Sequence, residues 1–179
     1  MRNFKKNRMK KIFLFIALCI MINSYSQNDW TKKSYGSLKY SYPKNWTELK
    51  YQSVNGKSTY GSQYFDLGKT SQFTVLEIPN DTGIVDAHKI PEEEIKNFFK
   101  NLFSPTSNFN LIENRTLSNI NAKYIKATAV TSKGLKLTTI AYVIFYKTKM
   151  IIVQGIFTSE NESEFLPTVN KIISTTKTI

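Results

Sequence analysis

One loop holds most of the residues that could do chemistry in this sequence. Asp81-Thr82-Gly83 matches the signature of aspartic proteases, in which two aspartates share one proton. Asp86 and His88 follow, and with the glutamates at 92–94 they could offer oxygen and imidazole ligands to a divalent cation. His88 is the only histidine, so a serine hydrolase would have to use it as its base.

Each of these patterns also has a simpler structural interpretation. A single Asp-Thr-Gly would serve only a homodimer, and Asn80 and the residues after it are those that a tight turn recruits. The spacing of Asp86 and His88 is not that of a zinc site, and acidic residues at 92–94 suit the start of a helix. We expect no catalytic, cofactor-binding or metal-binding residue. Asp81, Asp86, His88 and the aromatic Trp46 remain as binding candidates.

The first 26 residues predict export. Six basic residues and no acidic one precede an apolar run at 12–22, which is shorter than the roughly 20 residues of a bilayer-spanning helix. Ser24-Tyr25-Ser26 supplies small residues for cleavage, so we expect a signal peptide at 1–26 and a single domain at 27–179. The composition, rich in Lys, Asn, Ile and Ser, indicates a bacterium, which places the protein in the periplasm or outside the cell.

Removal of the signal peptide changes the chemistry of the chain. The net charge falls from +12 to +6, because six of the 25 basic residues and none of the 13 acidic ones are lost. The only cysteine, Cys19, is lost as well, so the domain contains no disulfide. Lipidation of Cys19 is disfavoured because Leu18 stands where a small residue is needed.

The periodicity of apolar residues predicts the elements that position the loop. Alternation favours strands at 38–42, 72–78, 111–117 and 122–130, and Asn55-Gly56 predicts a hairpin turn between strands 47–51 and 59–67. Pro91 and the glutamates after it predict a helix whose apolar residues, at 95, 98, 99, 102 and 103, share one face. A second amphipathic helix is expected from about Glu164, with Pro167 near its first turn.

Two strands determine the expected architecture. Strands 135–146 and 150–158 carry apolar residues on both faces, which predicts a hairpin in mid-sheet that is covered on both sides. The two helices are the available covers. We therefore expect an α+β fold in which helices cover both faces of an antiparallel sheet.

The segment from Leu38 to Trp46, with its Tyr42-Pro43 and the Trp after it, resembles the opening of the PsbP-like family. The order of elements and the closing Ile172-Ile173-Ser174 are also similar. That family includes extrinsic subunits of the photosynthetic oxygen-evolving complex, periplasmic DcrB-type proteins and a nuclear-import factor that binds Ran. The resemblance implies a PsbP-like α/β/α sandwich and a tendency to bind other proteins. It transfers no functional residue, and fold alone does not give function.

The expected function is that of a non-enzymatic binding module of the cell envelope, with an unidentified envelope protein as partner. An anionic lipid surface is a second expected partner, since the domain is mildly basic. Nucleic acid is not expected because the lysines do not cluster in sequence. A carrier of a hydrophobic ligand and a hydrolase or metal-dependent enzyme centred on residues 81–88 are left open as alternatives. The sequence does not determine the oligomeric state.

Overall fold

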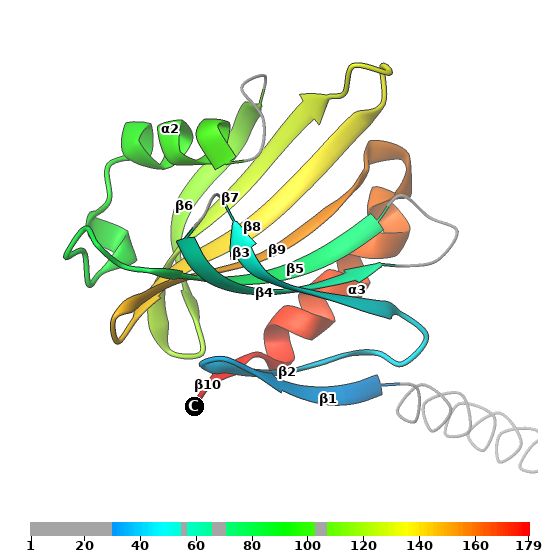
Figure 1. Ribbon diagram of the computed structural model, residues 1–179. Coiled ribbons are helices and arrows are strands. Elements are labelled where there is room, and N and C mark those ends of the chain that lie inside the picture. Colours follow the sequence, from blue (N-terminus) through cyan, green and yellow to red (C-terminus); the bar gives the residue numbers. More distant parts are fainter. Residues whose placement is uncertain (1–29, 55–56, 66–70, 103–106) are drawn as a thin grey trace, which may run out of the picture.

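The computed structural model describes residues 30–54, 57–65, 71–102 and 107–179. The predicted signal peptide, Cys19 and the Asn55-Gly56 turn lie outside the described residues. Within them the fold is mixed α+β, with antiparallel sheets and two α-helices, as the sequence predicts (Figure 1).

The larger sheet has seven antiparallel strands in the order β3-β4-β5-β9-β8-β7-β6. The two predicted hairpin pairings are confirmed, β3 with β4 and β8 with β9, and β6 pairs with β7 in a further hairpin. The strand bounds are β3 Thr47–Val54, β4 Lys57–Phe65, β5 Ser71–Pro79, β6 Asn108–Leu117, β7 Ile120–Val130, β8 Lys136–Tyr146 and β9 Lys149–Thr158.

A second, three-stranded sheet has the order β1-β2-β10, with bounds β1 Trp30–Tyr35, β2 Leu38–Pro43 and β10 Lys177–Thr178. Only β2 is among the predicted strands. Strand β10 has two residues, and its place depends on distant partners: Ile179 N donates to Ser37 O at 3.0 Å, and Thr178 N donates to Ser118 Oγ at 2.9 Å. No periodicity can reveal so short a strand.

Both predicted helices are present. Helix α2 spans Glu92–Leu102, with the three glutamates in its first turn. Helix α3 spans Glu162–Thr175 and begins earlier than expected, so Pro167 lies in its second turn. Two short 3₁₀ helices, η1 Ala87–Lys89 and η2 Ser159–Asn161, were not predicted. Within the described residues, no helix is both long and apolar enough to span a bilayer.

The larger core cluster joins α3, the three-stranded sheet and the long sheet. It contains Phe165, Val169 and Ile172 of α3 together with β2 residues such as Tyr40. Figure 1 shows α3 beside the small sheet under the long sheet, and Ser41 N of β2 donates to Thr175 Oγ1 of α3 at 2.9 Å. Helix α3 and the small sheet therefore pack against each other and against the long sheet in one cluster.

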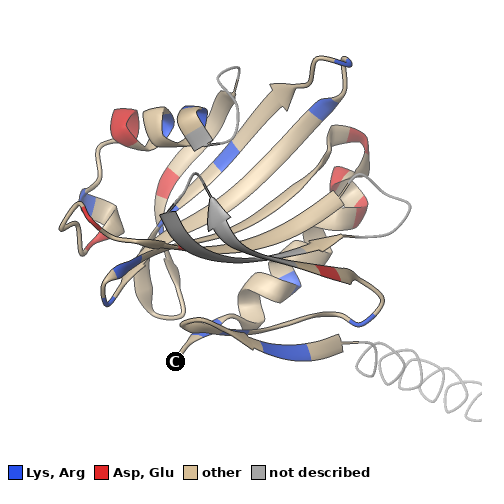
Figure 2. Ribbon diagram, in the orientation of Figure 1, with Lys and Arg blue, Asp and Glu red and all other residues tan. Residues whose placement is uncertain are grey.

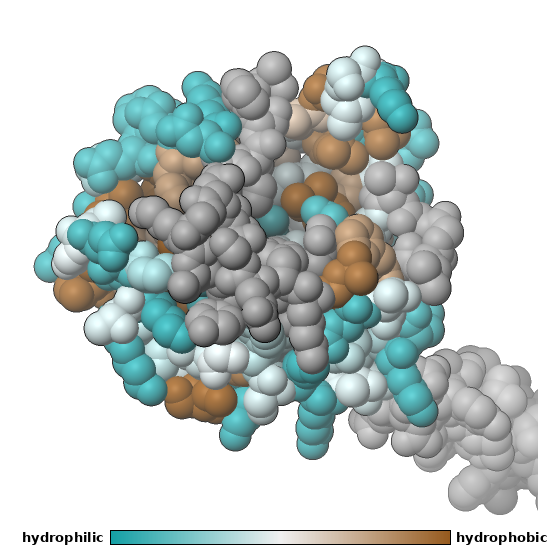
Figure 3. Space-filling view, in the orientation of Figure 1, coloured by the Kyte–Doolittle hydropathy of each residue, from teal (hydrophilic) through white to brown (hydrophobic). Residues whose placement is uncertain are grey.

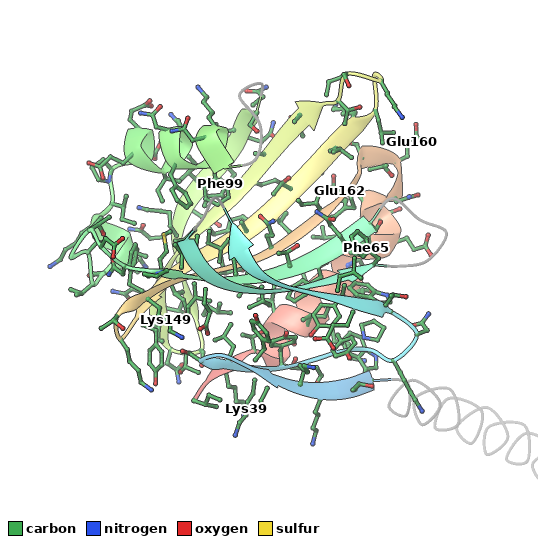
Figure 4. All side chains as sticks on the ribbon, viewed as in Figure 1. Lys39, Phe65, Phe99, Lys149, Glu160 and Glu162 are labelled. Carbon is green, nitrogen blue, oxygen red and sulfur yellow. The ribbon has the colours of Figure 1, made fainter. Side chains whose placement is uncertain are left out.

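The other core cluster contains α2. Ile95 and Phe99 of α2 pack with Ala141 and Val143 of β8 and with Ile152 of β9, among other residues. Figure 4 shows Phe99 beneath α2, pointing toward the long sheet. The neighbouring residues Ile140 and Ile144 belong to the cluster with α3, so alternate residues of β8 enter different clusters.

A buried carboxylate ties the two sheets together. The side chain of Glu77 on β5 is fully buried, accepts a hydrogen bond from Ser37 N in the β1–β2 turn, and pairs with Lys149 Nζ at 2.6 Å. Gly36 in that turn has φ +54°, and a Cβ there would overlap the Glu77 carboxyl group. The small hairpin and the carboxylate therefore fit only with glycine at this position.

Removal of Lys149 tests this link. We expect Lys149→Met to lower the free energy of unfolding by about 3 kcal/mol, because it leaves a carboxylate buried without its cation. Adding Glu77→Gln to that variant should restore part of the loss, since no charge then remains buried. Urea denaturation followed by tryptophan fluorescence measures both, and a double variant no more stable than Lys149→Met contradicts the interpretation.

The approach of α3 to β9 gives a second test. A Cβ at Gly155 would lie 2.9 Å from Cγ2 and 3.0 Å from Cγ1 of Val169. Gly155→Ala should therefore cost about 1–3 kcal/mol of stability by overpacking. In a Val169→Ala background the same change should cost clearly less, and equal costs in the two backgrounds would show that the α3 contact does not set the size of residue 155.

Candidate functional site

The turn that carries Asp81-Thr82-Gly83 is held by the side chain of Asn80. Asn80 Oδ1 accepts from Thr82 Oγ1 at 2.7 Å and from Thr82 N at 3.3 Å, while Asn80 Nδ2 donates to Ile84 O at 2.6 Å. Gly83 has φ +72°, which glycine adopts without strain. Asp81 is exposed on this turn. The local geometry is that of an Asx turn, the structural interpretation of the motif.

Asp86, the N-cap of η1, and His88 within η1 both make hydrogen bonds through their side chains. Asp86 caps η1: its Oδ1 accepts from His88 N at 3.0 Å and from Asn121 Nδ2, in the β6–β7 region, at 3.1 Å. These hydrogen bonds, the one from His88 N first, hold the pKa of the Asp86 carboxyl below its usual value. His88 Nε2 lies 2.8 Å from Arg115 O, so its N–H donates to the carbonyl.

The β6–β7 hairpin supplies the other half of this contact. Lys123 Nζ donates to Asn114 Oδ1 at 2.7 Å and to His88 O at 3.4 Å. The Arg115 guanidinium lies 3.7 Å from the centre of the Tyr124 ring and donates to Tyr142 Oη at 3.2 Å. Both η1 side chains singled out from the sequence thus fasten the loop to this hairpin.

This arrangement offers little to a reaction. His88 has one ring nitrogen committed to a backbone carbonyl, and the Asp86 oxygen that it could use is committed to two N–H donors. In the described part of the chain, no three His, Cys, Asp or Glu side chains lie close enough together to hold a metal ion. The geometry is that of a structural clamp.

Trp46 lies away from the loop, in the core cluster with α3. Its ring is 7% exposed and stacks on Phe165, with centroids 5.3 Å apart and planes 7° apart. Because the two rings cover each other, a ligand could stack only on the ring surface that this contact leaves exposed. A polar recess of about 200 Å³ borders them, lined in part by Asn45 and Glu164.

Among the other hollows in the described residues, two bear on the expected functions. A pocket of about 160 Å³ is lined mainly by apolar residues of the loop, α2 and β8, such as Ile84, Phe98 and Phe145. It is smaller than the roughly 300 Å³ at which ligand pockets usually begin. The larger recess, of about 640 Å³, lies on the three-stranded sheet beside the end of α3 and is lined by four lysines: Lys32, Lys33, Lys39 and Lys177.

Sequence reasoning missed this basic recess. Its lysines come from β1, β2 and β10, and two of these strands were not predicted. A signal was nevertheless present: segments 30–46 and 165–179 contain six lysines and no acidic residue. Figure 2 shows blue on the small sheet and red on α2 and at the start of α3.

The fold is similar to known structures. The solution structure of cyanobacterial PsbP (CyanoP) from Synechocystis sp. PCC 6803 matches with a TM-score of 0.66 and 10% identity, over 84% of this chain and 93% of that chain. A crystal structure from Bacteroides thetaiotaomicron VPI-5482 matches with a TM-score of 0.50 and 11% identity, over 83% of this chain and 48% of that one. No family model and no curated protein sequence matches the chain.

The clamp predicts a dependence of stability on acid pH. Because the pKa of Asp86 is lower in the folded chain, its contribution is present at neutral pH and is lost as the pH falls through the folded value, below 3.8. In Asp86→Asn this part of the acid dependence should be absent. Urea midpoints between pH 2 and pH 6 measure it, with Asp81→Asn as control; equal pH profiles for wild type and Asp86→Asn would contradict the assignment.

Proposed function

Because the chain has a PsbP-like fold in which its chemistry-bearing loop is a clamp, we propose that it is an exported, non-enzymatic binding module of the bacterial cell envelope that binds a protein. This proposal is supported chiefly by the hydrogen bonds of Asp86 and His88 to Asn121 and Arg115, because these bonds hold η1 against the β6–β7 hairpin.

Export is supported by the sequence. A basic leader without acids, an apolar run and small residues before Gln27 are the three parts of a secretory signal peptide. Periplasm or cell exterior is the compartment that we propose, with residues 27–179 as a single domain.

The proposed architecture has one helix on each face of the long sheet, as in an α/β/α sandwich. It is supported by the alternation along β8: Ile140 and Ile144 share a cluster with α3, whereas Ala141 and Val143 share one with α2. Successive side chains of a strand point to opposite faces. Both faces of such a sheet are packed against other elements, so the surfaces available for binding are the loops, the edges and the outer face of the small sheet.

The two alternatives each find less support. A carrier of a hydrophobic ligand needs an apolar cavity, and the apolar pocket under the loop measures about 160 Å³. An enzyme centred on residues 81–88 needs free acid and base groups, and the two on η1 are bound to backbone and amide groups.

Site-specific photocrosslinking in the native cells tests the binding function. A photoreactive amino acid would replace either Ser34, on the small sheet, or Val85, which is 77% exposed on the loop. An affinity tag would be inserted in the exposed 132–134 turn, because the chain end is bonded within the fold. We expect one envelope protein to be recovered reproducibly from at least one position.

The double variant Asp86→Asn/His88→Gln is the control. A binding module should still recover the same protein, since the loop is a clamp and not the interface chemistry. Recovery of no protein from either position, or loss of an assayable hydrolytic activity in the double variant, would overturn the proposal in favour of a carrier or an enzyme.

A further inference from the structure

The outer face of the three-stranded sheet presents three lysines together. In the strand register Lys39 lies opposite Lys177 on one side and opposite Ser34 on the other, and Lys32 lies opposite Ser41. Paired residues share a face of a sheet, and these alternate with buried Leu38 and Tyr40. We call Lys32, Lys39 and Lys177 with the two serines the basic face. Figure 4 shows Lys39 pointing away from the long sheet.

No acidic group in the described chain neutralises this face. Lys32, Lys39 and Lys177 make no ion pair or hydrogen bond there, whereas Lys33, which turns inward, pairs with Glu48 at 3.0 Å. Lys39 and Lys177 are directly opposite each other, and like charges in that position destabilise a sheet. Repulsion between these lysines therefore destabilises the folded chain, and an anion bound on the face would reduce that repulsion.

The end of α3 does not explain the lysines. Helix C-termini attract cations because their last carbonyls lack donors. Here Ser174 Oγ donates to Lys171 O at 2.8 Å, Thr175 Oγ1 and Thr176 Oγ1 donate to Ile172 O at 2.8 and 3.0 Å, and Thr176 N donates to Ile173 O. The hydroxyl-rich last turn is satisfied without lysine.

Protection against edge-to-edge pairing accounts for Lys32 and Lys177, which stand on the edge strands β1 and β10, but not for Lys39. Lysines that block aggregation stand on edge strands. Lys39 is on β2, the central strand of its sheet. A lysine on the exposed face of a central strand blocks no edge, so its placement with Lys32 and Lys177 calls for another cause.

We propose that the basic face binds an acidic segment of a partner protein. This inference rests on the binding function proposed above and specifies the chemistry of the partner. The recess of about 640 Å³ over the face, bordered by Ser174 and Thr175 of α3, has room for several side chains of an extended segment. Lysine ammonium groups and serine hydroxyls are suitable donors to Asp and Glu carboxylates.

A lipid surface fits this face less well. Membrane-surface binding combines cations with apolar or aromatic side chains that enter the headgroup region. Among the described residues, the exposed large apolar side chains are Leu49, Val85, Leu111, Val130, Leu135 and Ile179. Only Ile179, which directly follows β10, borders the basic face. Figure 3 shows mostly hydrophilic side chains projecting along the lower rim, where the small sheet lies, with one hydrophobic patch near the C-terminus.

The test uses charge reversal with a matched control. The triple variant Lys32→Glu/Lys39→Glu/Lys177→Glu reverses the basic face, and Lys100→Glu/Lys133→Glu/Lys136→Glu makes the same change of net charge at exposed lysines elsewhere. The probes are a fluorescent peptide of four Glu-Ser repeats, its Gln-Ser counterpart, and vesicles of phosphatidylglycerol. Circular dichroism melts confirm that each variant is folded.

We expect the wild type to bind the Glu-Ser peptide and not the Gln-Ser peptide, in fluorescence anisotropy at low salt. Reversal of the basic face should weaken binding at least about tenfold, as the loss of three ion pairs implies, while the control should change it less than about threefold. Equal weakening in both variants, no peptide binding by folded wild type, or sedimentation with vesicles without peptide binding would each overturn the proposal.

In-cell crosslinking with the same variants separates this proposal from the one on which it depends. If the protein captured by wild type is lost from the basic-face variant and retained by the control, the basic face is its site. If both variants retain it, a binding module remains and the basic face is not its contact. If wild type captures nothing, the binding function itself fails.

Discussion

Strands β8 and β9 are buried along both of their faces, and the remainder of the fold follows from that constraint. Ile140, Ala141, Val143 and Ile144 on β8 are each at most 1% exposed, although successive side chains point in opposite directions. Apolar surface on both sides of a sheet must be covered on both sides. Residues of β8 and β9 accordingly enter two core clusters, one with residues of α2 and one with residues of α3 and the small sheet.

The same pattern explains what the sequence could predict. Strands with period-two or two-faced apolar patterns, the β3–β4 hairpin and helix α2 could be read locally, because each buries side chains at its own period. Strands β1 and β10 could not. The polar residues of β1 do not mark a strand, and β10 exists only because Ser37 and Ser118 hold its backbone. The basic face depends on both strands, so its assembly from distant segments was not visible in the sequence.

The candidate residues show the same division. The turn at Asn80–Gly83 was predicted from turn-forming residues, which act locally. The roles of Asp86 and His88 were not, because their partners Asn121 and Arg115 lie on the β6–β7 hairpin. Trp46, a binding candidate in the sequence, stacks on Phe165, which is more than a hundred residues further along the chain. Residue type suggested chemistry, whereas the contacts of Asp86, His88 and Trp46 come from partners distant in the sequence.

The three-stranded sheet also constrains when the protein can become native. Its strands come from residues 30–43 and 177–178, and the chain is synthesised from its N-terminus. While residues 177–179 are still in the ribosome, β2 lacks its third strand and Ser37 O lacks its donor from Ile179. The Glu77 carboxylate, whose burial depends on the β1–β2 turn, then lies under an incomplete cover. Closure of the small sheet therefore awaits the emergence of residues 177–179 from the ribosome, later than any other described element of the fold.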